Sequence, residues 1–124
     1  MKPAYDQHLN LTLWLDQPSG NFFDPDMNWI GFVSNEHAFS SATLNWLGPL
    51  DEATFRDTRG KAVLWMPDLG SPTSGFAPHR PFKPFKPFAP FTPFKPFTPF
   101  TPFKPFAPAG GWSTLSAIEW LQGA

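Results

Sequence analysis

The chain has 124 residues, which is enough for one modest domain and an appendage. It contains 17 Pro and 15 Phe but no Cys, which excludes disulfide frameworks, thiolate metal sites and cysteine nucleophiles. The net charge of −1 hides a split, because residues 1–75 carry four basic and nine acidic side chains whereas residues 76–108 carry five basic ones and no acid. Such a split has two interpretations, namely solvation of both parts, or contact of the basic segment with the acidic one or with an acidic partner.

The N-terminal residues lack the apolar segment of a signal peptide, and no run in the chain approaches the 18 apolar residues typical of a membrane-spanning helix. The default expectation is therefore a cytoplasmic protein, with non-classical export left open.

Alternating leucines predict the first strand over residues 9–16, where Leu9, Leu11, Leu13 and Leu15 fall on one face. Further strands are predicted over three segments, namely 29–34, 37–47 and 61–66.

The segments between these strands carry turn signals. A polar loop is expected over 21–28, a break at Gly48 and Pro49, and one or two helical turns over 51–58. Gly31 marks a bulge or a close approach inside its strand.

The predicted organisation has four parts. Residues 1–67 form a small β-rich body, 68–75 a Gly/Ser/Pro linker, 76–108 a repeat arm and 109–124 a short C-terminal helix. The fold class is mainly β, with a small α+β fold as the alternative. A body of this size is near the lower limit for independent stability, so another segment is expected to complete its core.

The C-terminal helix is predicted from an N-cap at Ser113 and an apolar stripe at Leu115, Ile118 and Leu121, with a stop at Gly123. So short a helix is marginal alone in water, so it is expected to pack on the body, on the arm or on a partner.

The arm is a series of triplets with Pro at every third residue. Proline fixes its own φ, donates no hydrogen bond and pushes the preceding residue into the extended region. These effects exclude an α-helix and a central strand and leave polyproline II, which has three residues per turn and therefore aligns the repeat in three straight rows. The docking row consists of Phe76, Phe82, Phe85, Phe88, Phe91, Phe94, Phe97, Phe100, Phe103 and Phe106.

A second row carries the positive charges of the arm, at Arg80, Lys83, Lys86, Lys95 and Lys104. Residues 82–90, 91–99 and 100–108 are three nine-residue units, each with Lys in its central triplet. A long row of Phe is expected to be covered by the chain's own body, another copy, a separate protein or a membrane surface. Aromatic residues interleaved with cations also occur in single-stranded nucleic-acid binders, but the acidic body argues against that partner.

The sequence therefore predicts a non-catalytic structural or accessory protein whose arm docks on a protein partner or on another copy. An alternative comes from residues 79–108, whose cationic Pro/Phe-rich composition resembles proline-rich antimicrobial peptides. That resemblance implies a precursor in which the acidic body is a leader.

Other chemistries lack a matching motif. Asp24, Asp26 and Asn28 resemble the start of an EF-hand loop, but the sixth position is Trp29 and the twelfth is Asn35, so a turn and cap role is expected. The histidines show no spacing of metal ligands, and no acid–base or phosphate-binding motif is present. We expect no metal, no cofactor and no enzyme activity.

Overall fold

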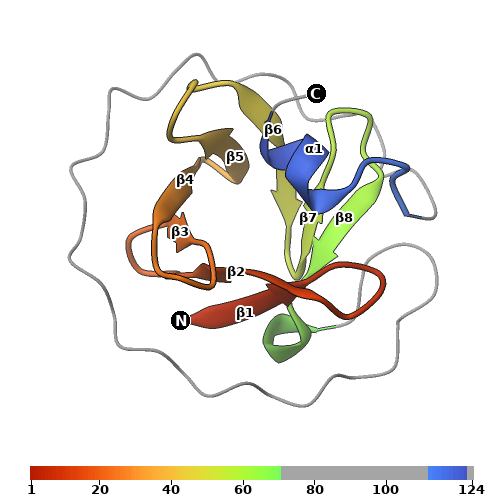
Figure 1. The fold of residues 1–124 in the computed structure, drawn as a ribbon, viewed down its shortest axis with the longest axis horizontal. Coiled ribbons are helices and arrows are strands. Elements are labelled where there is room, and N and C mark those ends of the chain that lie inside the picture. Colours follow the sequence, from red (N-terminus) through yellow and green to blue (C-terminus); the bar gives the residue numbers. More distant parts are fainter. Residues whose placement is uncertain (71–111, 123–124) are drawn as a thin grey trace.

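The computed structural model describes residues 1–70 and 112–122. Eight antiparallel strands form a closed barrel in which each strand pairs with the next and β8 pairs with β1 (Figure 1). The strands are β1 (Lys2–Tyr5), β2 (Leu11–Leu15), β3 (Asn21–Phe23), β4 (Trp29–Ser34), β5 (His37–Ser40), β6 (Trp46–Asp51), β7 (Thr54–Arg56) and β8 (Ala62–Trp65).

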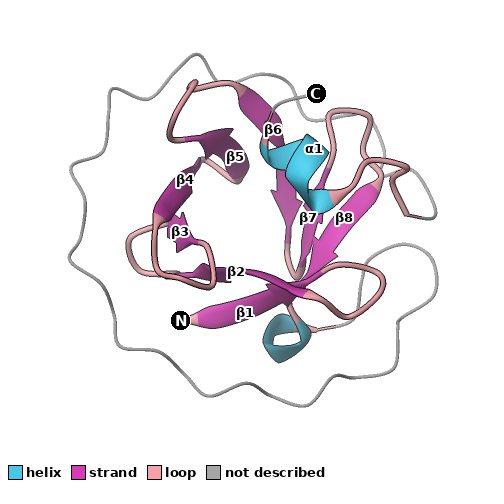
Figure 2. Cartoon of the chain, viewed as in Figure 1, coloured by secondary structure: helices cyan, strands magenta, loops and turns pink. Residues whose placement is uncertain are grey.

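Two short helices follow the barrel in the described part of the chain. The 3-10 helix η1 (Pro67–Leu69) comes directly after β8, and α1 (Ala117–Leu121) lies near the C-terminus (Figure 2). The prediction of a mainly β fold with one short C-terminal helix is confirmed. Neither of these helices has the length and hydropathy that crossing a bilayer requires.

The barrel consists of four consecutive hairpins with the same internal geometry. In each hairpin the second strand carries one extra residue, which forms a β-bulge. The bulge always lies opposite the last two paired residues of the first strand. The extra residues are Thr12, Ile30, Leu47 and Val63. Bulges bend a strand and increase its twist, so four equivalent bulges supply the curvature that closes so small a sheet.

A side-chain oxygen closes the tight loop inside each hairpin. Asp6 Oδ1, Asp24 Oδ1 and Asp57 Oδ1 each accept hydrogen bonds from two backbone N–H groups, all at 2.9 Å. In the third hairpin Ser40 Oγ takes this place, at 3.3 and 3.4 Å. Asp and Ser favour such turns because their short side chains reach the backbone two residues on. The turn role predicted for Asp24 is thus confirmed.

The interior of the barrel is filled by apolar side chains from all four hairpins. Phe22 and Phe55 are the large members, and their rings meet edge to face with centroids 5.7 Å apart. Gly31 gives Phe22 its space, because a Cβ at that position would lie 2.2 Å from the Phe22 ring. The close approach predicted at Gly31 is confirmed. The remaining core members are Ala4, Leu13, Leu15, Ala38, Leu47, Val63, Leu64, Met66 and Trp120.

Trp120 brings the C-terminal helix into this core. Its side chain is 1% exposed, and its ring centroid lies 5.5 Å from that of Phe55 and 6.4 Å from that of Phe22. Its indole Nε1 donates a hydrogen bond to the Arg56 carbonyl at 3.1 Å. Of the alternatives that the sequence left open, packing on the body is therefore the one observed.

The details of this helix differ from the prediction. Ser116, not Ser113, is the N-cap, and it forms a capping box with Glu119. Hydrogen bonds to the Glu119 carboxylate, first from the Ser116 backbone N–H and then from the Ser116 side chain, favour the charged form, so the pKa of Glu119 lies below its ordinary value. Ile118 is 69% exposed, so the predicted apolar stripe is wrong. The predicted stop at Gly123 lies outside the described residues.

Several predicted boundaries between strands are also wrong. The expected loop over 21–28 contains β3, and the expected helical turns over 51–58 contain β7. Gly48 and Pro49 lie inside β6, and the segment 37–47 is divided between β5 and β6 by a turn. β3 and β7 have three residues each, too few to display an alternating pattern, and a bulge at Leu47 interrupts the alternation in β6. Barrel closure rather than local sequence decides the conformation of these strands.

Candidate functional site

The docking row and the charged row predicted from sequence both fall within residues 71–111 and lie outside the described residues. Their proposed contacts stay predictions. The barrel itself offers two features that bear on function, namely its outer face and a pocket beside the C-terminal segment.

Aromatic side chains occupy the outer face of the barrel. Cross-strand partners share a face of the sheet, and neighbouring residues on one strand point to opposite faces. Residues 13, 31 and 64 point into the barrel, so the residues that follow them, Trp14, Phe32 and Trp65, point outward. Pairing then extends the outer face from Trp14 through Phe23 to Trp29, from Phe32 through Phe39 to Trp46, and from Trp65 to Tyr5. We name this set the outer aromatic belt, and its members are Tyr5, Trp14, Phe23, Trp29, Phe32, Phe39, Trp46 and Trp65.

Neighbouring belt members touch each other. The Phe32 and Phe39 rings stack with centroids 5.5 Å apart, and the Trp29 ring lies 6.3 Å from that of Phe32. On the third hairpin the indole Nε1 of Trp46 donates a hydrogen bond to His37 Nδ1 at 3.1 Å. Phe32 and Phe39 are 0% and 1% exposed although they do not face the core of the barrel.

Three belt-side residues carry buried polar atoms that have no hydrogen-bond partner among the described residues. These atoms are Tyr5 Oη, both side-chain polar atoms of Asn21, and Trp29 Nε1. Asn21 belongs to the outer face because it pairs with Phe32. Burial, and secondarily the negative charge of Asp68, raises the pKa of Tyr5, so its phenol keeps its proton and remains a donor. An unsatisfied buried donor is costly, so this face is suited to an occupant that supplies carbonyl oxygens.

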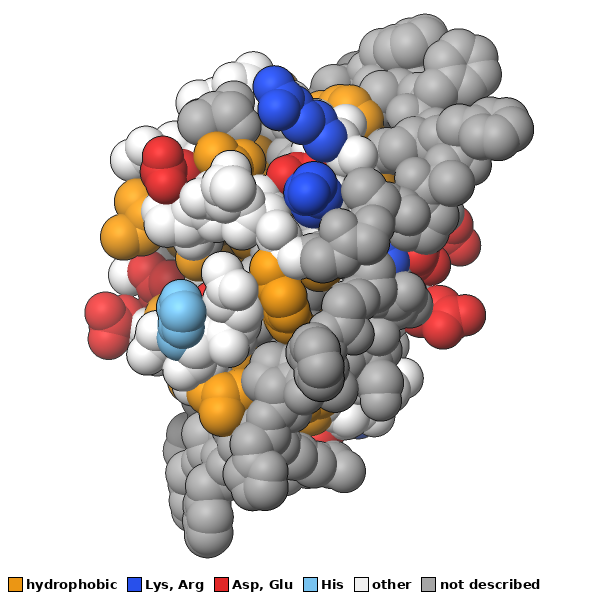
Figure 3. Space-filling view, turned by 90° about the vertical axis from the view of Figure 1, so that its right-hand side faces the viewer, with side chains coloured by type: hydrophobic (Ala, Val, Ile, Leu, Met, Phe, Trp, Pro, Cys, Tyr) orange, Lys and Arg blue, Asp and Glu red, His pale blue; other side chains and the backbone are white. Residues whose placement is uncertain are grey.

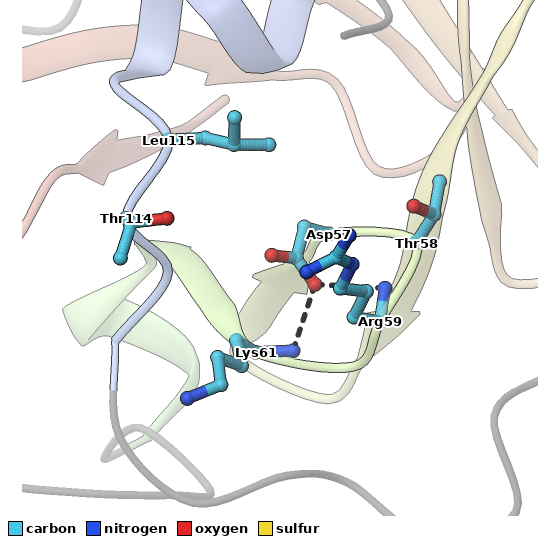
Figure 4. Close-up of a pocket in the computed structure, with 6 residues that line it drawn as sticks. All are labelled: Asp57, Thr58, Arg59, Lys61, Thr114 and Leu115. Atoms are coloured by element: carbon cyan, nitrogen blue, oxygen red, sulfur yellow. Dashed lines mark hydrogen bonds between the residues drawn. The ribbon is translucent and has the colours of Figure 1, made fainter.

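The pocket with a volume of about 510 Å³ lies beside the fourth hairpin (Figure 4). Its lining residues are Asp57, Thr58, Arg59, Lys61, Thr114 and Leu115. In Figure 4 the side-chain amine of Lys61 points away from Asp57, whose dashed contacts run to backbone nitrogens.

The Asp57 carboxylate in this pocket already has a structural role. Oδ1 accepts from the backbone of Arg59 and Lys61, and Oδ2 accepts from Ser113 Oγ at 2.7 Å. The Ser113 N–H also donates to the Ala62 carbonyl at 2.7 Å. Asp57 therefore joins the C-terminal segment to the fourth hairpin. In residues 1–70 and 112–122 no three His, Asp or Glu side chains gather in a way that would hold a metal ion.

The sequence does carry a signal for this architecture that the strand patterns did not reveal. A residue pair with Asp or Ser in second place recurs at 18, 16 and 17 residues, as Tyr5–Asp6, Phe23–Asp24, Phe39–Ser40 and Arg56–Asp57. The second residue of each pair supplies the oxygen that closes the tight loop, and it lies directly after the first strand of the hairpin or, for Ser40, at the end of that strand. The repeat is weak in sequence because only the loop oxygen and the bulge position need to recur.

Comparisons with known proteins agree with the four-fold geometry. A family model described as "4-fold beta flower protein" matches residues 2–121. Searches of curated proteins and of solved structures gave no match. The matched range includes all four hairpins, η1 and α1. The chain belongs to the 4-fold beta flower protein family.

Proposed function

We propose that this chain is a non-catalytic structural or accessory protein of the cytoplasm that assembles through its Phe-x-Pro arm, residues 76–108. In this proposal the Phe row docks on a protein surface, with another copy of the chain as the partner. The Lys and Arg row faces solvent or acidic side chains of that partner.

The observation that supports this proposal is that the described residues build a barrel core of their own. Within residues 1–70 and 112–122, the members of the core cluster come from the barrel strands, from Met66 and from Trp120. Trp120 of the C-terminal segment thus helps to complete the core, as the small size of the body led us to expect. A row of ten Phe in the arm is a large apolar surface, and such surfaces mark interaction sites.

Charge supports the same proposal. The described body is acidic and the arm carries five cations without an acid, so the arm of one copy is attracted to the body of another. Salt screens contacts between exposed charges over about 10 Å at 0.1 M ionic strength, so the Phe row must supply most of the affinity.

The test is the mass of the full chain by light scattering over a range of concentrations. We expect dimers or larger species to grow with concentration. Serine at three row positions should abolish them, since burying one Phe contributes about 1.5–3 kcal/mol. The three substitutions are Phe88→Ser, Phe91→Ser and Phe97→Ser.

The matched control places three serines in the same triplets but outside the Phe row, as Ala89→Ser, Thr92→Ser and Thr98→Ser. This variant is expected to assemble like the parent chain. A chain that stays monomeric at every concentration, or one whose assembly survives loss of the three Phe, contradicts the proposed function.

A further inference from the structure

We propose that the outer aromatic belt is a receptor for polyproline II and that its occupant is the arm of this chain, residues 76–108, which encircles the barrel. The inference rests on the proposed function in one respect, namely that the arm is a docking element. It adds the surface that receives the arm and the way in which copies exchange it.

The chemistry of the belt matches what a polyproline II segment offers. Domains that bind such segments use grooves lined with aromatic side chains. A polyproline II chain makes no internal hydrogen bonds, so its carbonyls are free acceptors. The belt supplies donors that lack a partner within residues 1–70 and 112–122, at Tyr5 Oη, Asn21 Nδ2 and Trp29 Nε1. Docking of the arm would satisfy these donors. It would also keep the belt rings out of water, six of which are at most 4% exposed, namely Tyr5, Trp14, Phe23, Phe32, Phe39 and Trp65.

Both ends of the arm segment adjoin the same strand. Residue 71 follows Gly70, whose carbonyl accepts a hydrogen bond from Trp65 Nε1 in β8. At the other end Trp112 forms a parallel bridge with Ala62, also in β8. A segment that leaves and returns beside one strand is positioned to make one full circuit of the barrel.

The length of the arm fits one such circuit. The repeat has 33 residues, which span about 100 Å as polyproline II. Eight strands spaced about 4.8 Å apart and tilted by about 40° give a barrel radius of about 8 Å. A chain packed about 8 Å outside that wall then has a circuit of about 100 Å.

Charge is arranged to hold an arm in this place. Acidic residues lie in the loops at both ends of the barrel, with Asp6, Asp24 and Asp26 at one end and Asp16, Glu36 and Glu52 at the other. Figure 3 shows acidic side chains on its left and right sides with hydrophobic ones between them. The cations of an encircling arm would face these two rims.

Exchange of the arm between two copies would use the same contacts, which explains how docking on its own barrel and assembly coexist.

The test uses the full chain and the rate at which chymotrypsin cuts after Phe in the arm. The residue after each Phe of the row is Lys, Thr or Ala, so every one of these bonds is a substrate when the arm is free. The reference is a synthetic peptide of residues 76–108 under the same conditions. We expect the arm of the full chain to be cut at least about tenfold more slowly than the peptide, since cleavage requires release of the docked row.

Removal of the three donors tests the receptor itself. The triple variant Tyr5→Phe, Asn21→Leu and Trp29→Phe should raise the cleavage rate about tenfold through the loss of three hydrogen bonds, without lowering the melting temperature of the barrel. Trp46→Phe is the matched control, because its indole N–H is already bonded to His37. It should leave the arm protected.

The outcomes separate the two proposals. An arm cut as fast as the free peptide, or a triple variant with unchanged protection, overturns the belt as receptor even if the chain assembles. Protection that exists only at concentrations where the chain is multimeric overturns the encircling arm and keeps assembly. Protection in a chain that is monomeric at all concentrations supports the belt and contradicts the proposed function.

Discussion

Replacing Trp120 with alanine is expected to destabilise the barrel by about 3–5 kcal/mol, the range found for large aromatic residues in cores. Trp120 is 1% exposed and contacts Phe22 and Phe55 at the centre of the core. The change leaves a cavity between these rings and removes the bond from Nε1 to the Arg56 carbonyl. The measurement is the free energy of unfolding from urea titration of the full chain.

The neighbouring residue Ile118 provides the control for this result. It lies on the same helix but is 69% exposed, so Ile118→Ala should change the free energy of unfolding by less than about 0.5 kcal/mol. Equal effects of the two substitutions would mean that α1 does not insert into the barrel, and the description of the core would then be wrong.

Replacing Gly48 with alanine is the second large effect, at about 2–6 kcal/mol. Gly48 has a φ of +142°, which side chains rarely adopt, and an added Cβ would lie 1.9 Å from the Arg56 carbonyl oxygen. That oxygen belongs to the backbone and cannot swing away. Strain in φ and overlap with β7 therefore add, and the thermal unfolding midpoint of the full chain should fall.

Gly70 separates these two contributions. Its φ of +139° is nearly the same, but the nearest atom to an added Cβ is 3.9 Å away. Gly70→Ala should therefore show only the cost of the backbone strain, about 1–3 kcal/mol. If Gly48→Ala costs no more than Gly70→Ala, the close passage of β6 along β7 is contradicted.

The sequence predicted the mainly β fold because leucines alternate in residues 9–16 and because residues 61–66 contain the strand-favouring run Val63, Leu64 and Trp65. The first of these strands starts later than predicted, at Leu11, and Leu9 lies in the preceding turn with a φ of +67°. The sequence did not predict β3 and β7, because three residues cannot show a period of two and their identity as strands depends on barrel closure. The prediction of Ser113 as the N-cap was also wrong. Its hydroxyl has the chemistry of an N-cap but donates a hydrogen bond to Asp57 Oδ2 instead.

The two surfaces that the proposals use differ in how visible they are in the sequence. The Phe row is visible in sequence because its period of three is regular. The outer aromatic belt is not, because its members alternate with core residues of the same chemistry, as Trp14 does with Leu13 and Leu15. Only the register of the strands tells which of these apolar residues point outward.

The size of the dilute full chain in solution tests the central claim most directly, namely that the arm lies on the barrel. Small-angle X-ray scattering of the monomer, with its mass checked by light scattering, should give a radius of gyration of about 14 Å, as for any compact chain of 124 residues. A free segment 71–111 would instead reach about 60 Å from the barrel at full extension and raise that radius well above the compact value. An enlarged monomer of that kind would contradict the claim.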